Sequence, residues 1–171
     1  MDKLLLRRAT KEDAAKFLSL WEALDSETEF MLYEPGERKA TLEQQASQLA
    51  ISEKSKNAAI YVIEDTVQSE LVGFTAGQRN TNLRDRYTLN VVIGLRQIYT
   101  GKKLGAKLLS ELEVWAKSIG IKRLELTVMT ENEFAISLYK LVGYEIEGTK
   151  RMSVHLSSGF KDEYVMSKLL W

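Results

Sequence analysis

One segment constrains the fold of this chain more than any other. An apolar strand ending at Ile93 leads into a glycine-containing turn, and the turn opens the longest helix that the sequence predicts, from Leu104 onward. The first N–H groups of a helix lack intrahelical partners and carry the positive end of the helix dipole, so this turn suits a pyrophosphate. It has neither the Gly-Lys-Ser/Thr ending of a P-loop nor the G-x-G-x-x-G spacing of a dinucleotide site. The pattern alone leaves open that the glycines serve only the packing of a tight turn.

Periodicity and capping residues predict the order β-α-α-β-β-β-α-β-α-β-β, a mixed α/β (α+β) fold. The polar Asp65–Glu70 stretch predicts a hairpin rather than a crossover. The expected strands are Leu4–Arg8, Ala58–Glu64, Leu71–Gln78, Tyr87–Ile93, Leu124–Val128, Tyr144–Lys150 and Glu163–Leu170. The expected helices follow caps at Thr10/Asp13, Thr41/Gln44 and Asn132, with the longest running from Leu104 to Ile119.

Composition narrows the function classes. The 171 residues are expected to form one domain, 1–171, and the absence of cysteine excludes a disulfide framework and a cysteine nucleophile. One histidine and scattered carboxylates give no metal signature, and 24 basic residues balance 24 acidic ones, so we expect no metal and no nucleic-acid partner. No stretch resembles a signal peptide or a membrane span, which favours the cytoplasm.

A second segment sharpens this interpretation. Asn132 and Tyr139 are seven residues apart, about two helical turns, so they lie on one side of a helix that Gly143 ends. With the first segment, this one resembles the acetyl-CoA-binding turn and the C-terminal Asn-x-x-Ala-x-x-x-Tyr-x-x-x-Gly-Tyr/Phe pattern of the GNAT superfamily of N-acetyltransferases. The resemblance covers nearly the whole chain and implies a mostly antiparallel central sheet flanked by helices. The 146–151 and 162–166 segments look most like the branch that holds ribosomal-protein and small-molecule acetyltransferases.

The resemblance implies acetyl-CoA as cosubstrate and assigns its contacts. Main-chain groups on a splayed strand would meet the pantetheine arm, a turn would hold the pyrophosphate, and the following helix would add further contacts. The residues at these positions are Ile93, Gly94 and Leu95 on the strand, Thr100, Gly101, Lys102, Lys103, Leu104, Gly105 and Ala106 on the turn, and Asn132, Ala135 and Tyr139 on the helix.

This chain departs from the family pattern at two positions of the turn. Thr100 replaces the usual Gln or Arg, and Lys103 replaces a glycine. A residue already in the first helical turn can keep ordinary dihedrals, so we expect weaker cofactor binding at most. Lys102 and Lys103 could attract phosphates or could simply be solvated.

Tyr139 is the candidate general acid, because the family has a tyrosine beside the thioester sulfur and a phenol can protonate a departing thiolate. Its alternative role is that of an ordinary core aromatic, and Asn132 could be only a helix cap. The sequence identifies no general base, and Glu27, Glu29, Glu34 and His155 are only weak candidates. Phe30, Met31 and Tyr33 could line the acceptor site.

The expected function is therefore acetyl transfer from acetyl-CoA to a primary amine by direct attack, with the acceptor unidentified. The alternative is a non-catalytic CoA-binding sensor of the same fold. The changes at Thr100 and Lys103 give it some weight, whereas the presence of Tyr139 and Asn132 argues against it. A homodimer through the C-terminal strands is plausible from the family alone.

Overall fold

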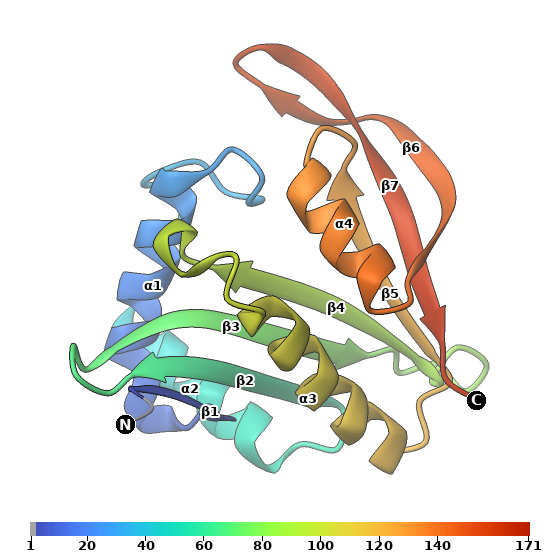
Figure 1. Cartoon of the computed structure of the whole chain (residues 1–171). Helices are drawn as coiled ribbons and strands as arrows, with labels where there is room; N and C mark the ends of the chain where they lie inside the picture. The colour runs from blue at the N-terminus through green and yellow to red at the C-terminus, as the bar shows by residue number, and fades with distance from the viewer. Residues whose placement is uncertain (1–2) are drawn as a thin grey trace.

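The computed structural model describes residues 3–171 and contains one seven-stranded sheet in the order β1-β2-β3-β4-β5-β7-β6 (Figure 1). Short 3-10 turns precede α1 and follow β4. The strands are β1 Leu4–Arg8, β2 Ala58–Asp65, β3 Glu70–Arg79, β4 Thr88–Leu95, β5 Arg123–Met129, β6 Glu145–Leu156 and β7 Gly159–Leu169. The helices are α1 Ala14–Glu27, α2 Leu42–Lys54, α3 Leu104–Ser118 and α4 Glu133–Leu141. The predicted fold class and element order are confirmed.

All neighbouring strands pair antiparallel except β4 and β5, which run parallel. Their ladder covers only Thr88–Asn90 against Arg123–Glu125. Beyond it the two strands diverge toward their carboxyl ends, as Figure 1 shows near the middle of the sheet. The sheet is thus continuous at one end of β4 and split at the other.

Two helices cover each face of the sheet. Figure 1 shows α3 and α4 in front of it and α1 and α2 behind. The front core includes Leu89 and Val91 of β4 with Leu109 and Leu112 of α3, and the rear core packs Phe17 of α1 onto β2 and β3. Leu112 is 1% exposed, and burying a leucine side chain completely contributes about 1.5–3 kcal/mol. A third cluster packs Leu104 and Leu108, at the start of α3, against Ile63 and Val72. Together the three clusters fix the positions of the helix ends that border the split.

The helix starts follow the predicted caps. The Thr41 hydroxyl accepts a hydrogen bond from the Gln44 N–H at 3.1 Å, and the Gln44 side chain accepts one from the Thr41 N–H at 2.9 Å. The Asp13 carboxylate accepts from the Thr10 N–H at 2.8 Å, although a 3-10 turn separates Thr10 from α1. Capping chemistry is local, which is why the sequence predicts it well.

The C-terminal hairpin is longer than the sequence predicts. β6 continues past Lys150 to Leu156, and β7 starts at Gly159 rather than at Glu163. The pairing is irregular between Lys150 and Val154, where Met152 adopts φ +53°. Most of β6 is exposed, so no apolar alternation marks this extension, and backbone hydrogen bonds to β7 form it instead. None of the helices within residues 3–171 is long and apolar enough to cross a membrane.

Candidate active site

A groove of about 1170 Å³ lies where β4 and β5 separate. It is bordered by α1 and the loop after it, the turn before α3, α4, and residues of β6 and β7. All the predicted cofactor residues except Lys102 line it: Ile93, Gly94, Leu95, Thr100, Gly101, Lys103, Leu104, Gly105, Ala106, Asn132, Ala135 and Tyr139. The Lys102 ammonium instead lies 5.2 Å from the centre of the Tyr99 ring.

The split exposes backbone groups of both strands to the groove. The Arg96 N–H donates to the Val72 carbonyl, which fixes the alternation along β4 and turns the N–H and C=O of Ile93 and Leu95 away from β3. In the same way, the Leu170 N–H donates to the Lys122 carbonyl, and the alternation along β5 then turns the N–H and C=O of Thr127 away from β7. Because β4 and β5 do not pair here, an extended ligand with amide groups can hydrogen-bond along the gap.

The turn before α3 offers a run of free donors. Within residues 3–171, no protein acceptor takes a hydrogen bond from the N–H groups of residues 101–106. The first turn of α3 also holds no acidic side chain that would compete for them. Free N–H groups together with the positive end of a 15-residue helix form an anion site that suits phosphate.

The backbone at Lys103 differs from the expectation that ordinary dihedrals would accommodate it. Lys103 is the residue before the helix rather than part of its first turn, and it adopts the left-handed conformation at φ +61°. Gly101 also has a positive φ, +76°. The turn therefore needs left-handed backbone at two positions, and at the second a side chain carries the steric cost that glycine would avoid.

Lys103→Gly is expected to raise the free energy of unfolding by about 0.5–1 kcal/mol. Relief of the left-handed strain, about 1–2 kcal/mol, outweighs the greater freedom of glycine in the unfolded chain, about 0.5–1 kcal/mol. Urea unfolding of both proteins measures the difference. Lys102→Gly is the matched control, since Lys102 has no positive φ and glycine there should only destabilise. Equal destabilisation by both changes would contradict the strain argument.

Tyr99 anchors the start of this turn to the β2–β3 turn, at the same end of the strands. Its hydroxyl donates to Asp65 Oδ2 at 2.9 Å, and both side chains are buried. Asp65 also accepts from the N–H groups of Gln68 and Val67 in the β2–β3 turn. The hydrogen bond from the Gln68 N–H is the largest of the contacts that hold the pKa of Asp65 below its ordinary value despite burial. Asp65 is thus a charged acceptor that fixes Tyr99 and the chain after it.

Tyr139 lies on α4 with its hydroxyl free for the groove. The side chain is 7% exposed, and the hydroxyl has no hydrogen-bond partner among the described residues. In the described chain, only one fully buried side-chain N or O atom lacks a hydrogen-bond partner, and that atom is Arg8 Nε. Because the Tyr139 hydroxyl also lacks a partner, it cannot be fully buried and must keep some accessible surface. Tyr139 is one of the residues that line the groove. Burial raises the pKa of Tyr139 well above its ordinary value, which keeps the phenol protonated at neutral pH.

Asn132 caps the start of α4, and Gly105 lets α4 pack closely on α3. The Asn132 side chain caps α4 by accepting from the Ala135 N–H at 3.2 Å, as predicted, and it also lines the groove. A Cβ at Gly105 would lie 2.7 Å from Leu138 of α4, so only glycine lets the two helices approach this closely without rearrangement. The anion site and Tyr139 therefore lie on adjoining helices.

The face of the groove toward α1 has a different character. Glu27, Glu29, Phe30, Met31 and Tyr33 line it as expected, whereas Glu34 and His155 do not. Glu27 is occupied, because Arg96 Nε donates to it at 2.9 Å and the Gln97 N–H at 3.0 Å. These bonds tie the end of α1 to the end of β4, which makes Glu27 a structural residue rather than a free base.

Sequence reasoning missed Trp21, Arg38 and Glu163 as residues of the groove. The helical periodicity assigned Trp21 to the core, and no pattern marks Arg38 in its loop. The sequence predicts Glu163 as the first residue of an alternating strand, and that alternation is the signal that could have placed its side chain on the face opposite the core.

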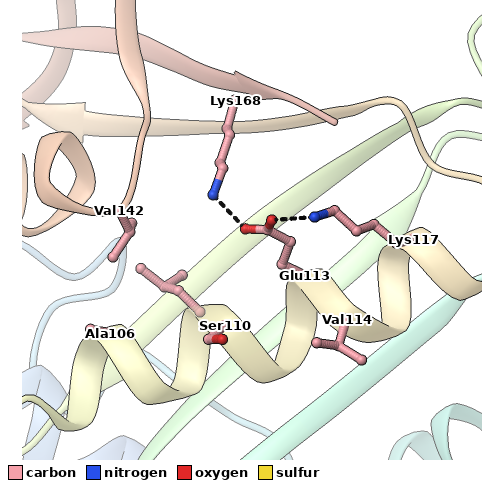
Figure 2. A pocket seen from close by; sticks show the side chains of 8 residues that line it. Ala106, Ser110, Glu113, Val114, Lys117, Val142 and Lys168 are labelled. Carbon is pink, nitrogen blue, oxygen red and sulfur yellow. Dashed lines mark hydrogen bonds and ion pairs between the residues drawn. The ribbon is translucent and has the colours of Figure 1, made fainter. Parts of the chain in front are cut away.

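A smaller depression of about 380 Å³ lies beside the groove, between α3, Val142 just after α4, and β7 (Figure 2). Glu113 occupies it, with Lys168 Nζ at 2.6 Å and Lys117 Nζ at 2.9 Å from its carboxylate. Burial would raise the pKa of Glu113, but the two lysines outweigh burial and lower it. The three side chains satisfy one another and attach α3 to β7. Across residues 3–171, no three His, Cys, Asp or Glu side chains are grouped to hold a metal ion.

Comparisons with known proteins agree with this geometry. The model of the acetyltransferase (GNAT) family matches residues 17–144. No curated protein matches the chain in a sequence comparison.

Solved structures match over almost the whole chain. A GNAT-family acetyltransferase from Streptococcus pneumoniae is 30% identical with a TM-score of 0.92, over 98% of this chain and 99% of that one. The protein YncA from Salmonella typhimurium, solved with its cofactor acetyl-CoA, is 18% identical with a TM-score of 0.86, over 99% and 95% of the two chains. A ribosomal-protein-alanine N-acetyltransferase from Brucella melitensis is 21% identical with a TM-score of 0.83, over 97% and 99%.

Proposed function

The chain belongs to the GNAT family of acetyltransferases, and from this premise we propose that it transfers the acetyl group of acetyl-CoA to a primary amine by direct attack. We also propose that residues 1–171 form a single N-acetyltransferase domain. Its location in the cytoplasm and its assembly as a homodimer stay predictions from the sequence.

The observation that carries the proposal is the groove through the split sheet. On the side of α3 and α4 it joins the free N–H groups of residues 101–106, the unpaired backbone of β4 and the Tyr139 hydroxyl. On the side of α1 it is lined by a separate set of residues, so two ligands can approach the same point from opposite faces of the sheet. That arrangement suits a reaction between a thioester and a second substrate without a covalent enzyme intermediate.

Most of the predicted cofactor residues then have a defined task. The turn of residues 101–106 holds the pyrophosphate with its N–H groups. Ile93 and Leu95 hydrogen-bond the amides of the pantetheine arm along the gap, and Ala135 and Asn132 border it from α4. YncA, solved with acetyl-CoA, shares the fold, which supports acetyl-CoA as the donor.

Tyr139 protonates the leaving sulfur. The lone pair of the neutral amine forms the C–N bond, the C–S bond breaks, and its electron pair stays on sulfur, which takes the phenolic proton of Tyr139. The nitrogen releases one proton, and solvent returns a proton to the tyrosinate. The hydroxyl suits this role because it is protonated at neutral pH and faces the groove without a protein partner.

The test is release of CoA thiol by the purified protein with acetyl-CoA and a panel of primary amines, with acetyl-CoA binding followed by calorimetry. We expect acetyl-CoA to bind and thiol release to depend on the amine. Binding without amine-dependent release would favour the sensor alternative, to which Thr100 and Lys103 gave weight. The absence of binding would overturn both functions.

A further inference from the structure

The face of the groove toward α1 is called the acceptor side here, because the proposed function places the amine there. Almost all the charged side chains on this side are paired with neighbouring groups. Glu27 is held by Arg96 and by the Gln97 N–H, as described above. Arg38 donates through Nε to Asp25 at 2.6 Å, and Asp25 is buried. The guanidinium also stacks between Trp21 and Tyr33, with its central carbon 3.7 Å and 4.2 Å from the two ring centres. Arg38 is thus a fixed part of the lining, with both faces covered.

Glu163 is the exception among the partly buried charges. Its side chain is 16% exposed, yet no N–H or hydroxyl of the described residues donates a hydrogen bond to its carboxylate. Its ion pair with Lys150 is long, 3.7 Å, and Lys150 is itself half exposed. Glu29 also lines this side but lies on an exposed loop, where water competes for it.

The register of β7 directs Glu163 toward the acceptor. Glu163 pairs with Met129 at the open end of β5 and with Lys150 of β6. Its neighbour Tyr164 packs on the core beneath α3 and α4, so Glu163 points to the opposite face, the face that α1 borders. The carboxylate therefore lies one strand away from the gap where β4 and β5 separate.

The rest of this side is mostly apolar. Residues of α1, of the loop after it and of β4, β5 and β6 present aromatic and aliphatic side chains there: Trp21, Leu24, Phe30, Met31, Tyr33, Val92, Met129 and Val154. Such a surface favours an uncharged body on the ligand, because a second charge would lose its hydration without a partner.

We propose, on the basis of the function proposed above, that Glu163 binds the amino group of the acceptor and that the acceptor is a small primary amine carried on an apolar body. Alkylamines are protonated at neutral pH, with a pKa near 10.4, so the acceptor arrives as a cation. Glu163 provides the one partly buried carboxylate of the groove that lacks a hydrogen-bonded partner in the described chain. Polyamines would leave charges on the apolar lining, and acidic amines would place a negative charge near Glu163.

Glu163 also has a defined place in the proton balance. The ammonium first loses one proton to solvent and becomes the neutral nucleophile, still hydrogen-bonded to the carboxylate. As the C–N bond forms, the nitrogen passes its second proton to Glu163, while Tyr139 gives its proton to sulfur. Both side chains return to their starting states by exchange with solvent.

The experiment compares 2-phenylethylamine with its neutral analogue 2-phenylethanol. Binding of each to the wild-type protein, with and without CoA, is measured by calorimetry at pH 7, alongside kcat/KM for 2-phenylethylamine and spermidine. We expect the amine to bind at least about tenfold more tightly than the alcohol, since a hydrogen bond between charged groups is stronger than one that involves a neutral hydroxyl. We expect kcat/KM to be higher for 2-phenylethylamine than for spermidine.

Three variants separate binding from a structural effect. Glu163→Gln should weaken binding of the amine about tenfold or more and leave binding of the alcohol and of acetyl-CoA unchanged. Lys150→Met should strengthen binding of the amine severalfold, because it removes the cation that competes for Glu163. If the Glu163–Lys150 ion pair were only structural, Glu163→Gln and Lys150→Met would both weaken binding. Glu145→Gln, an exposed carboxylate of β6 outside the groove, is the control and should bind like the wild type.

The proposal is overturned if Glu163→Gln binds 2-phenylethylamine as tightly as the wild type, if amine and alcohol bind equally, or if spermidine is the better substrate. Each of these results can occur while acetyl-CoA binds and some amine is acetylated. Failure of this inference is therefore distinct from failure of the proposed function, which the absence of acetyl-CoA binding, or of thiol release with every amine tested, would reveal.

Discussion

Tyr139→Phe is expected to lower kcat by roughly 10²–10⁴ while acetyl-CoA affinity stays nearly unchanged. The change removes one oxygen from a hydroxyl that has no protein partner in the described chain, so neither the packing of α4 nor any hydrogen bond is lost. Without the phenolic proton, the thiolate must leave unprotonated or take a proton from water. Steady-state kinetics with a saturating amine, together with calorimetric binding of acetyl-CoA, measures the two quantities.

Tyr144→Phe is the matched control for this substitution. Tyr144 is also buried, its ring centre lies 5.9 Å from that of Tyr139, and it does not line the groove. Burial raises its pKa as it does for Tyr139. We expect kcat of this variant to remain within a few-fold of the wild type. If Tyr139→Phe and Tyr144→Phe had the same turnover, Tyr139 would be no more than a core aromatic.

Ala106→Asp is expected to weaken acetyl-CoA binding about ten- to hundredfold without lowering the stability of the protein. Ala106 lies in the first turn of α3 and lines the groove beside the free N–H groups. A carboxylate there repels a diphosphate by roughly 1.4–2.8 kcal/mol. The same carboxylate interacts favourably with the helix dipole, by about 0.3–1 kcal/mol. Calorimetry gives the affinity, and thermal unfolding without ligand gives the stability.

The opposite signs of these two effects make the prediction specific. Val114→Asp places the same charge eight residues further along α3, about 12 Å away, at an exposed position outside the groove. That distance exceeds the Debye length of about 8 Å at physiological ionic strength, so affinity should change less than twofold. Unchanged affinity in Ala106→Asp would place the pyrophosphate elsewhere, whereas a large loss of stability would mean that the turn itself had been disrupted.

Several parts of the molecule follow from the sequence because they rest on interactions between near neighbours. The Thr41–Gln44 box and the Asn132 cap join residues three positions apart, and the helical period alone places Asn132 and Tyr139 on one side of α4. The order of strands and helices follows from the same local patterns. The family resemblance then indicated the residues expected to contact the cofactor, and all of them except Lys102 line the groove.

The remaining features depend on contacts between distant parts of the chain. No local rule indicates that β4 and β5 stop pairing after three residues, that Arg38 lies between Trp21 and Tyr33, or that Lys103 takes a left-handed backbone. Glu163 faces the groove because β7 inserts between β5 and β6 in one register, and a slip of one residue would turn it to the other face. The sequence by itself determined the order of the elements, their caps and the place of the glycine-containing turn before α3, since these depend on short spacings. The tertiary structure alone decided which charges remain unpaired in the groove, because pairing is a property of side chains that only the folded sheet brings together.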